Sequence, residues 1–196
     1  MRPSRVIYIL LLALLSLCCS GTKNLIDEKM ISSRTDVFSE ITVDSQPPDG
    51  FSDVLIKAQV KTHSARHYPW QEKGLPAGER KFRYLFNIDG QAVTWDVAGK
   101  EEDTPVYDEN GKKTFDGGEG IKYSFDKRIR LRAGPHNVFL ALPGENVISQ
   151  AAITVEPGMQ YKLEYKPIYE WDRLHRQSYR HGIGGFEVFF NSIHVR

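Results

Sequence analysis

Apolar and polar residues alternate along much of the chain beyond residue 40. In the segment 53–62, one face of an extended chain would carry Val54, Ile56, Ala58 and Val60, and the other Lys57, Gln59 and Lys61. The segments 81–88 and 91–97 alternate in the same way and flank Asp89-Gly90, a strong signal for a two-residue hairpin. This period of two predicts three β-strands, the last two joined as a hairpin.

The segment 129–165 repeats the pattern at short intervals. Its apolar-rich runs are separated by turn signals at 133–135 (AGP), 143–146 (PGEN) and 157–158 (PG). We therefore predict a β-meander of four strands joined by tight turns. The run 138–142 (VFLAL) is apolar throughout, so we expect a central strand that is covered on both faces.

Further strands are predicted at 41–44, 121–125 and 186–195, and no convincing helix is predicted after the N-terminal segment. Eight to ten short strands with turn signals between them are typical of a β-sandwich or a barrel. We predict an all-β fold for 41–196, namely an antiparallel β-sandwich of the immunoglobulin/transthyretin type.

Three segments without periodicity interrupt the strand pattern, and we interpret them as loop excursions at 63–80, 99–120 and 167–185. Long loops inside a compact domain are often functional. The glycine-rich end of the second excursion, 116–120, is expected to be exposed and mobile.

The N-terminal segment differs from the rest of the chain. Arg2 and Arg5 precede an unbroken apolar run at 6–17. This run is too short for a helix to cross a hydrocarbon core of about 30 Å, and it is typical of a signal peptide. We predict a signal peptide at 1–18 and a polar tether at 19–40, with room for one helical turn between lipid and domain.

Both cysteines of the chain, Cys18 and Cys19, directly follow the apolar run. This arrangement resembles the lipobox of bacterial lipoproteins, in which a cysteine is diacylated and becomes the mature N-terminus. A small residue is expected before that cysteine, which favours Cys19 and leaves Cys18 as the alternative lipidation site. The resemblance implies a membrane partner, reached through an N-terminal lipid. Cleavage after Cys18 or Ser20, giving a soluble secreted protein, is the competing interpretation.

The residue after Cys19 is Ser20 rather than Asp. By the sorting of Gram-negative lipoproteins, this implies the outer membrane of the bacterial cell envelope, facing the periplasm or the surface.

A second resemblance involves turn motifs. Gly134-Pro135-His136, the strand 138–142, the strand 151–155 and Gly158 resemble the PEGA-type repeat and related carboxypeptidase-regulatory-like β-sandwich modules. The segment 43–48 and Ile88-Asp89-Gly90 resemble the opening strand and turn of that module. The segment 53–80 separates these two elements, whereas in the module they lie close together. The resemblance implies an extracytoplasmic sandwich that binds or spaces, usually without catalysis.

Composition and motifs exclude several functional classes. The formal net charge is +1, so nucleic acid is not expected as a partner. The chain lacks GxSxG, HExxH and phosphate-loop motifs, so we predict neither an enzyme nor a cofactor. The spacing of His63, His67, His175 and His181 supports no metal site. Asp108-Glu109-Asn110-Gly111 does not match an EF-hand, because glycine stands at the fourth position.

Aromatic and basic residues gather in the first and third excursions. The candidate binding surface consists of Tyr68, Trp70, Tyr169, Trp171, Arg173, Arg176 and Tyr179. Exposed aromatic rings stack on sugars or anchor a protein partner, although the same rings could cap the ends of the sandwich core. We predict an accessory or scaffold protein of the envelope with a protein partner. The alternative is a carbohydrate-binding module for a cell-wall or surface glycan.

Overall fold

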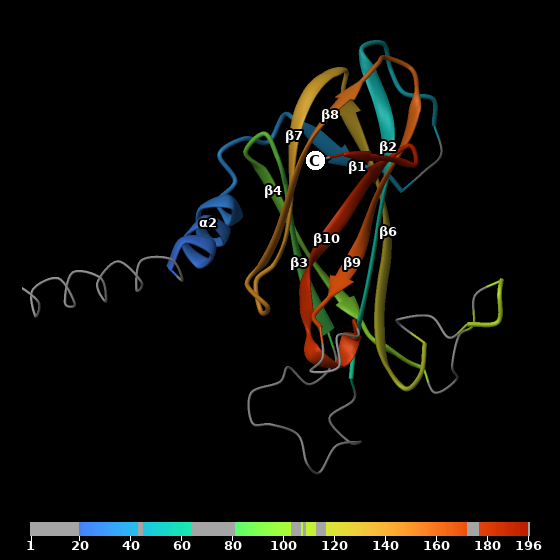
Figure 1. Cartoon of the computed structure of the whole chain (residues 1–196). Coiled ribbons are helices and arrows are strands. Elements are labelled where there is room, and N and C mark those ends of the chain that lie inside the picture. The colour runs from blue at the N-terminus through green and yellow to red at the C-terminus, as the bar shows by residue number, and fades with distance from the viewer. Residues whose placement is uncertain are drawn as a thin grey trace, which may run out of the picture.

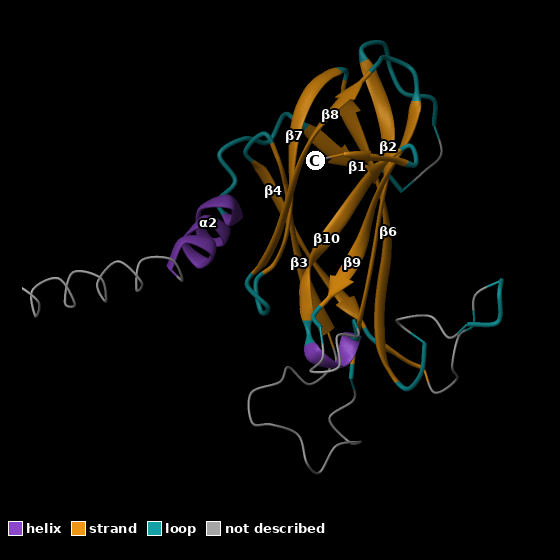
Figure 2. Cartoon of the chain, viewed as in Figure 1, coloured by secondary structure: helices purple, strands orange, loops and turns teal. Residues whose placement is uncertain are grey.

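The computed structural model describes residues 20–42, 45–63, 81–102, 107, 109–112, 117–171 and 177–195. Two β-sheets pack face to face around one core, with one α-helix beside them (Figure 1; Figure 2). The predicted all-β sandwich is therefore confirmed. Among the described residues, no helix has the length and apolar character needed to cross a membrane.

The larger sheet has seven strands in the order β1-β6-β2-β9-β10-β11, with β5 pairing to β6. Their bounds are β1 (Phe38–Glu40), β2 (Phe51–Thr62), β5 (Lys100–Glu102), β6 (Gly120–Arg132), β9 (Gln160–Tyr169), β10 (Ile183–Phe190) and β11 (Ile193–Val195). All its pairings are antiparallel except that of β2 with β9, which is parallel.

The smaller sheet has four antiparallel strands in the order β4-β3-β7-β8. Their bounds are β3 (Lys81–Ile88), β4 (Gln91–Ala98), β7 (Gly134–Leu142) and β8 (Val147–Val155). Together the two sheets enclose an aromatic-rich core in which Phe86 stacks on Trp95, with ring centroids 5.4 Å apart.

Period-two segments form the strands that the sequence predicts. In β2, the four apolar residues named above are buried, and Lys57 and Gln59 are partly exposed. Lys61 is an exception, because it was expected on the polar face but is completely buried. The Asp89-Gly90 hairpin is confirmed, with Asp89 at φ 48° and Gly90 at φ 92°. Both residues have the positive φ of a type I′ turn.

The segment 129–165 contains the predicted strands, but the meander is wrong. Only β7 and β8 form a hairpin, whereas the chain changes sheets between β6 and β7 and again between β8 and β9. A turn signal specifies that the chain reverses, and it does not specify which sheet receives the next strand. The long-range pairings decide that, with β6 beside β2 and β7 beside β3.

The β7 strand is central and covered on both faces, as predicted. Leu140 faces the core between the sheets and is fully buried. Phe139 and Ala141 point to the outer face, where they are buried in a second apolar cluster with Ile26 and Leu85. Ile26 belongs to α2 (Ser20–Met30), so this helix supplies the second cover.

The α2 helix corrects two predictions, since a tether was expected at 19–40 and no helix after the N-terminal segment. The helix lies beside the smaller sheet (Figure 1), and its apolar residues Leu25 and Ile26 belong to the outer apolar cluster of that sheet. The Asn87 side-chain amide donates to the Lys29 carbonyl over 2.8 Å at the end of the helix. A short polar helix gains stability from such tertiary contacts rather than from its own periodicity, so the sequence pattern did not indicate it.

Residues 37–40 are also part of the fold rather than a tether. The β1 strand pairs with β6 in the larger sheet. Its Phe38 carbonyl accepts from the Gln91 side-chain amide at 2.8 Å, and the amide oxygen accepts from the backbone nitrogen of Val37 at 2.8 Å. Trp95 donates its ring N–H to Glu40 over 2.9 Å. Since Gln91 and Trp95 lie on β4, β1 links the two sheets.

Three smaller predictions are also corrected. The segments 121–125 and 129–131 belong to the single strand β6, and the predicted strand 186–195 is the hairpin β10–β11, turned at Asn191 and Ser192 with φ 48° and 69°. Gly117 and Gly118 are buried rather than exposed.

Candidate binding site on the larger sheet

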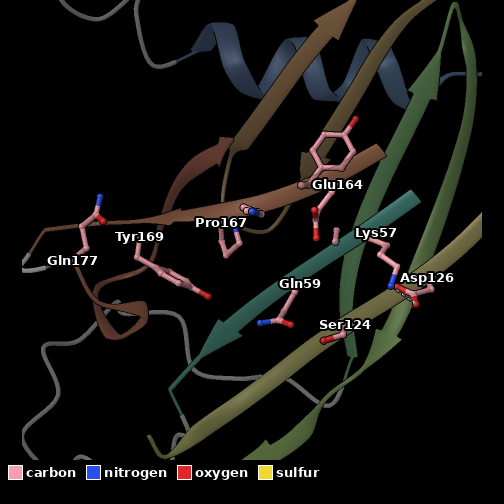
Figure 3. Close-up of a pocket in the computed structure, with 11 residues that line it drawn as sticks. Lys57, Gln59, Ser124, Asp126, Glu164, Pro167, Tyr169 and Gln177 are labelled. Carbon is pink, nitrogen blue, oxygen red and sulfur yellow. Dashed lines mark ion pairs between the residues drawn. The ribbon is translucent and has the colours of Figure 1, made fainter. Parts of the chain in front are cut away.

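The larger sheet splits between its two central strands. Parallel pairing of β2 with β9 runs from Asp53–Gln160 to Ala58–Tyr165 and then stops. Beyond that point β2 continues paired only with β6, and β9 continues paired only with β10. A gap therefore opens in the middle of the sheet, and Figure 3 shows the two strands diverging there.

A hollow of about 470 Å³ occupies the split and the outer face beside it. Residues from β2, β6 and β9 line it, together with one from the segment after β9: Lys57, Ala58, Gln59, Ser124, Asp126, Glu164, Tyr165, Lys166, Pro167, Tyr169 and Gln177. In Figure 3, Pro167, Tyr169 and Gln177 form one wall, and Gln59 and Ser124 lie opposite. The volume suits a small polar ligand or one to a few residues of a longer one.

Opposite charges balance each other in and around the hollow. Lys57 forms an ion pair with Asp126 over 3.2 Å, and Glu164 forms one with the neighbouring Lys162 over 2.9 Å. The Lys166 ammonium lies 4.4 Å from the centre of the Phe189 ring. The floor therefore offers hydrogen-bonding groups of both kinds without a strong field of one sign.

A buried lysine lies at the far end of the split, beyond the last pair of β2 and β9. The Lys61 side chain is 0% exposed, and its ammonium donates to Glu102 over 3.0 Å and to the Gly118 carbonyl. It also lies 5.1 Å from the centre of the Tyr179 ring. Within the split, the Lys61 backbone amide donates to the Tyr169 hydroxyl over 3.0 Å. This cluster, which we call the Lys61 cluster, ties the second and third excursions to β2.

The Lys61 cluster is closely packed, and its carboxylate is charged. A Cβ atom on Gly120 would lie 2.5 Å from the Thr62 carbonyl oxygen and 2.9 Å from Lys61 Cε, so a side chain does not fit there. Burial tends to raise the pKa of Glu102, but Lys61 and Lys122, at 3.0 and 3.4 Å, outweigh it and hold that pKa below its ordinary value. Glu102 therefore remains ionised at neutral pH.

The predicted surface residues that the structure describes differ in their exposure to solvent. Tyr169 and Tyr179 are only 5% and 3% exposed, so they fill the end of the core rather than offer binding rings. Tyr169 is the last residue of β9. This strand continues through Pro167, which pairs with Phe186 of β10. Trp171 is 61% exposed, as a binding ring would be.

The other predicted site residues lie outside the described residues. These are Tyr68, Trp70, Arg173, Arg176 and both cysteines, together with His67 and His175 of the histidine set. Among the described histidines, His63 is buried and His181 is exposed. Within the described ranges, no group of three His, Cys, Asp or Glu side chains could hold a metal ion.

The floor of the hollow was not predicted from the sequence, because Lys57, Gln59 and Ser124 have the pattern of an ordinary solvated strand face. They form a site only because β9 pairs beside β2 and then separates from it. These strands are about a hundred residues apart in the chain, and no local pattern indicates that pairing.

Comparisons with protein-family models, with curated proteins and with solved structures give no match to this chain. The geometry above is therefore the basis for a functional proposal.

Proposed function

We propose that this protein is an envelope-anchored, non-catalytic β-sandwich lipoprotein of bacteria with an accessory or scaffold role toward a protein partner. One observation carries the proposal: α2 begins at Ser20, one residue after the preferred lipidation site Cys19, and packs on the smaller sheet. An acylated Cys19 would thus attach the lipid to the folded domain without a long tether. Within the part of the chain that the structure describes, no such helix packs on the outer face of the larger sheet, and we expect a partner to bind there.

Lipid anchoring is energetically sufficient for this role. Each buried CH₂ group contributes about 0.8 kcal/mol, and two or more acyl chains hold a protein stably where one chain gives only marginal binding. Attachment to the outer membrane follows from Ser20 in the sorting position.

The non-catalytic part of the proposal rests on the charge arrangement. Lys57 and Asp126 neutralise each other in the hollow, and Glu164 is paired with Lys162. General acid–base chemistry instead needs a side chain that is placed to transfer a proton to or from the substrate. The resemblance to PEGA-type modules points in the same direction, since those modules bind or space.

Labelling with radioactive palmitate in a bacterial host tests the anchor. We expect label in the full chain, with globomycin causing unprocessed precursor to accumulate. Cys19→Ala should abolish the label, and the matched control Cys18→Ala should retain it. A labelled Cys19→Ala variant together with an unlabelled Cys18→Ala variant would move the anchor to Cys18. Absence of label from the wild-type chain would refute the lipoprotein.

Site-specific photo-crosslinking in cells tests the protein partner. Glu187 on β10 and Thr94 on β4 are both exposed, one on each sheet. A photoreactive residue at position 187 should trap one defined envelope protein, and one at position 94 should not. The adduct should disappear when lipidation is blocked. Equal trapping from both positions, or none from position 187, would contradict a partner on the larger sheet.

A further inference from the structure

We propose that the hollow in the split between β2 and β9 binds a neutral oligosaccharide, with the exposed ring of Trp171 at its rim. This inference concerns the larger sheet alone and depends neither on lipidation nor on the protein partner proposed above. The sequence pattern favours the aromatic loops for sugar binding, whereas the hollow lies on the sheet.

The strand arrangement disfavours one common mode of peptide binding. Strand addition needs a free sheet edge with unpaired backbone groups. The edges of β2 and β9 that face the split do not pair with each other beyond Ala58 and Tyr165, but each of these edges is only a few residues long, and Pro167 on β9 has no N–H to donate. Within the split, the Lys61 amide is already bonded to the Tyr169 hydroxyl. A ligand in the hollow therefore meets mainly side chains.

The charges of the hollow select against ionic ligands. An anion bound to the Lys57 ammonium would be repelled by the Asp126 carboxylate, which lies 3.2 Å from that ammonium. It would also lie near Glu164, which is paired with Lys57 across β2 and β9. Lys166 stands opposite Glu187 across β9 and β10. Because each positive side chain has a carboxylate nearby, neither a phosphate nor a cation finds an uncompensated partner.

The side chains also select against a mainly apolar ligand. Beside the apolar surfaces of Ala58, Tyr165, Pro167 and Tyr169, the hollow is lined by amide, hydroxyl, carboxylate and ammonium groups. An apolar ligand would remove these groups from water without replacing their hydrogen bonds, which is unfavourable.

A sugar chain has the complementary chemistry. Its hydroxyls donate and accept at once, so they match neighbouring groups of opposite kind such as Lys57 with Asp126, or Ser124 with Gln59. Its C–H face needs an aromatic ring, and Trp171 is 61% exposed. Trp171 forms a backbone bridge with Gln177, which lines the wall of the hollow. This bridge places the Trp171 backbone beside the wall of the hollow.

Calorimetry on the purified full chain tests the site with defined probes: the neutral oligosaccharides maltohexaose, cellohexaose and chitohexaose, and the anionic polygalacturonate and heparin fragments. We expect at least one neutral probe to bind and the anionic probes to bind more weakly. Ser124→Phe, which fills the hollow from an exposed position, should abolish binding. The matched control Thr94→Phe, exposed on the smaller sheet, should leave binding unchanged.

Trp171→Ala should weaken binding about tenfold, as expected for loss of one aromatic contact. Unchanged circular dichroism and melting temperature will show that each variant is folded. Binding of no neutral probe by the folded wild-type chain would overturn the proposal, as would tighter binding of an anionic probe or full binding by Ser124→Phe. The wild type could bind no sugar while Ser124→Phe loses the protein crosslink at position 187. That pair of results would assign the hollow to a protein interface instead. Palmitate labelling is read separately, so failure of the sugar site does not affect the lipid anchor.

Discussion

The Lys61 cluster yields the most quantitative prediction, because it places a charged side chain in the interior. Lys61 is 0% exposed and its carboxylate partner Glu102 is 23% exposed. Glu102 has a second partner in Lys122, whereas the other contacts of Lys61 are the Gly118 carbonyl and the Tyr179 ring. Removing either member of the pair should therefore have unequal consequences.

Glu102→Ala leaves the Lys61 ammonium buried without a carboxylate. Breaking a buried ion pair in this way costs about 3–5 kcal/mol of unfolding free energy. Lys61→Met removes the charge itself and keeps most of the side-chain volume. Glu102 still has Lys122 and partial contact with water, so the main loss is the donor to the Gly118 carbonyl, worth about 1–3 kcal/mol.

The double variant Lys61→Met/Glu102→Ala distinguishes this explanation from a sum of lost contacts. With the buried charge gone, it should be about as stable as Lys61→Met and more stable than Glu102→Ala alone. Two contacting residues commonly show coupling energies of about 0.5–3 kcal/mol. If the double variant matches Lys61→Met, the coupling energy equals the full loss from Glu102→Ala, about 3–5 kcal/mol, which is at or above the upper end of that range.

Urea unfolding at neutral pH measures these differences, with fluorescence of the buried Trp95 and circular dichroism as two probes. Coincident transitions will support the two-state treatment. The reasoning is refuted if the two single losses simply add in the double variant, or if Glu102→Ala unfolds within about 0.5 kcal/mol of wild type, which is the range of an ordinary surface substitution.

Three further predictions concern the same fold. The folded-state pKa of Glu102 lies below its ordinary value of 4.5, so its stabilising contribution is present above that value and is lost as the pH falls through the folded pKa. The difference in unfolding free energy between wild type and Glu102→Gln should therefore narrow below about pH 4. A constant difference down to about pH 2 in urea titrations would contradict this assignment. Leu140→Asp should cost about 3–5 kcal/mol, because the side chain is fully buried, whereas Thr154→Asp at an exposed position should stay within about 0.5 kcal/mol; equal stabilities in thermal unfolding would disprove the core assignment. Ile26→Asp should release α2 from the smaller sheet while the sandwich stays folded, which proteolysis and amide exchange within 20–31 would detect as faster rates. Asp27→Ala at an exposed position is the control, and unchanged protection of that segment in Ile26→Asp would show that Ile26 does not hold the helix.

The sequence by itself determined most of the strands of this protein. Period-two alternation is a local property, so β2, β3 and β4 were predicted with their buried faces, and the Asp89-Gly90 turn followed from the positive φ that both residues tolerate. The doubly apolar run in β7 likewise required two covers.

Only the tertiary structure decided what those covers are and where the strands go. The second cover of β7 is α2, whose polar sequence contributes just Ile26 as a buried residue. Lys61 lies on the polar face by alternation, yet it is buried because two excursions close over it. The hollow exists because β2 and β9 pair in parallel and then part. Such contacts join residues far apart in the chain, and their free energy depends on the whole fold rather than on any local pattern of residues.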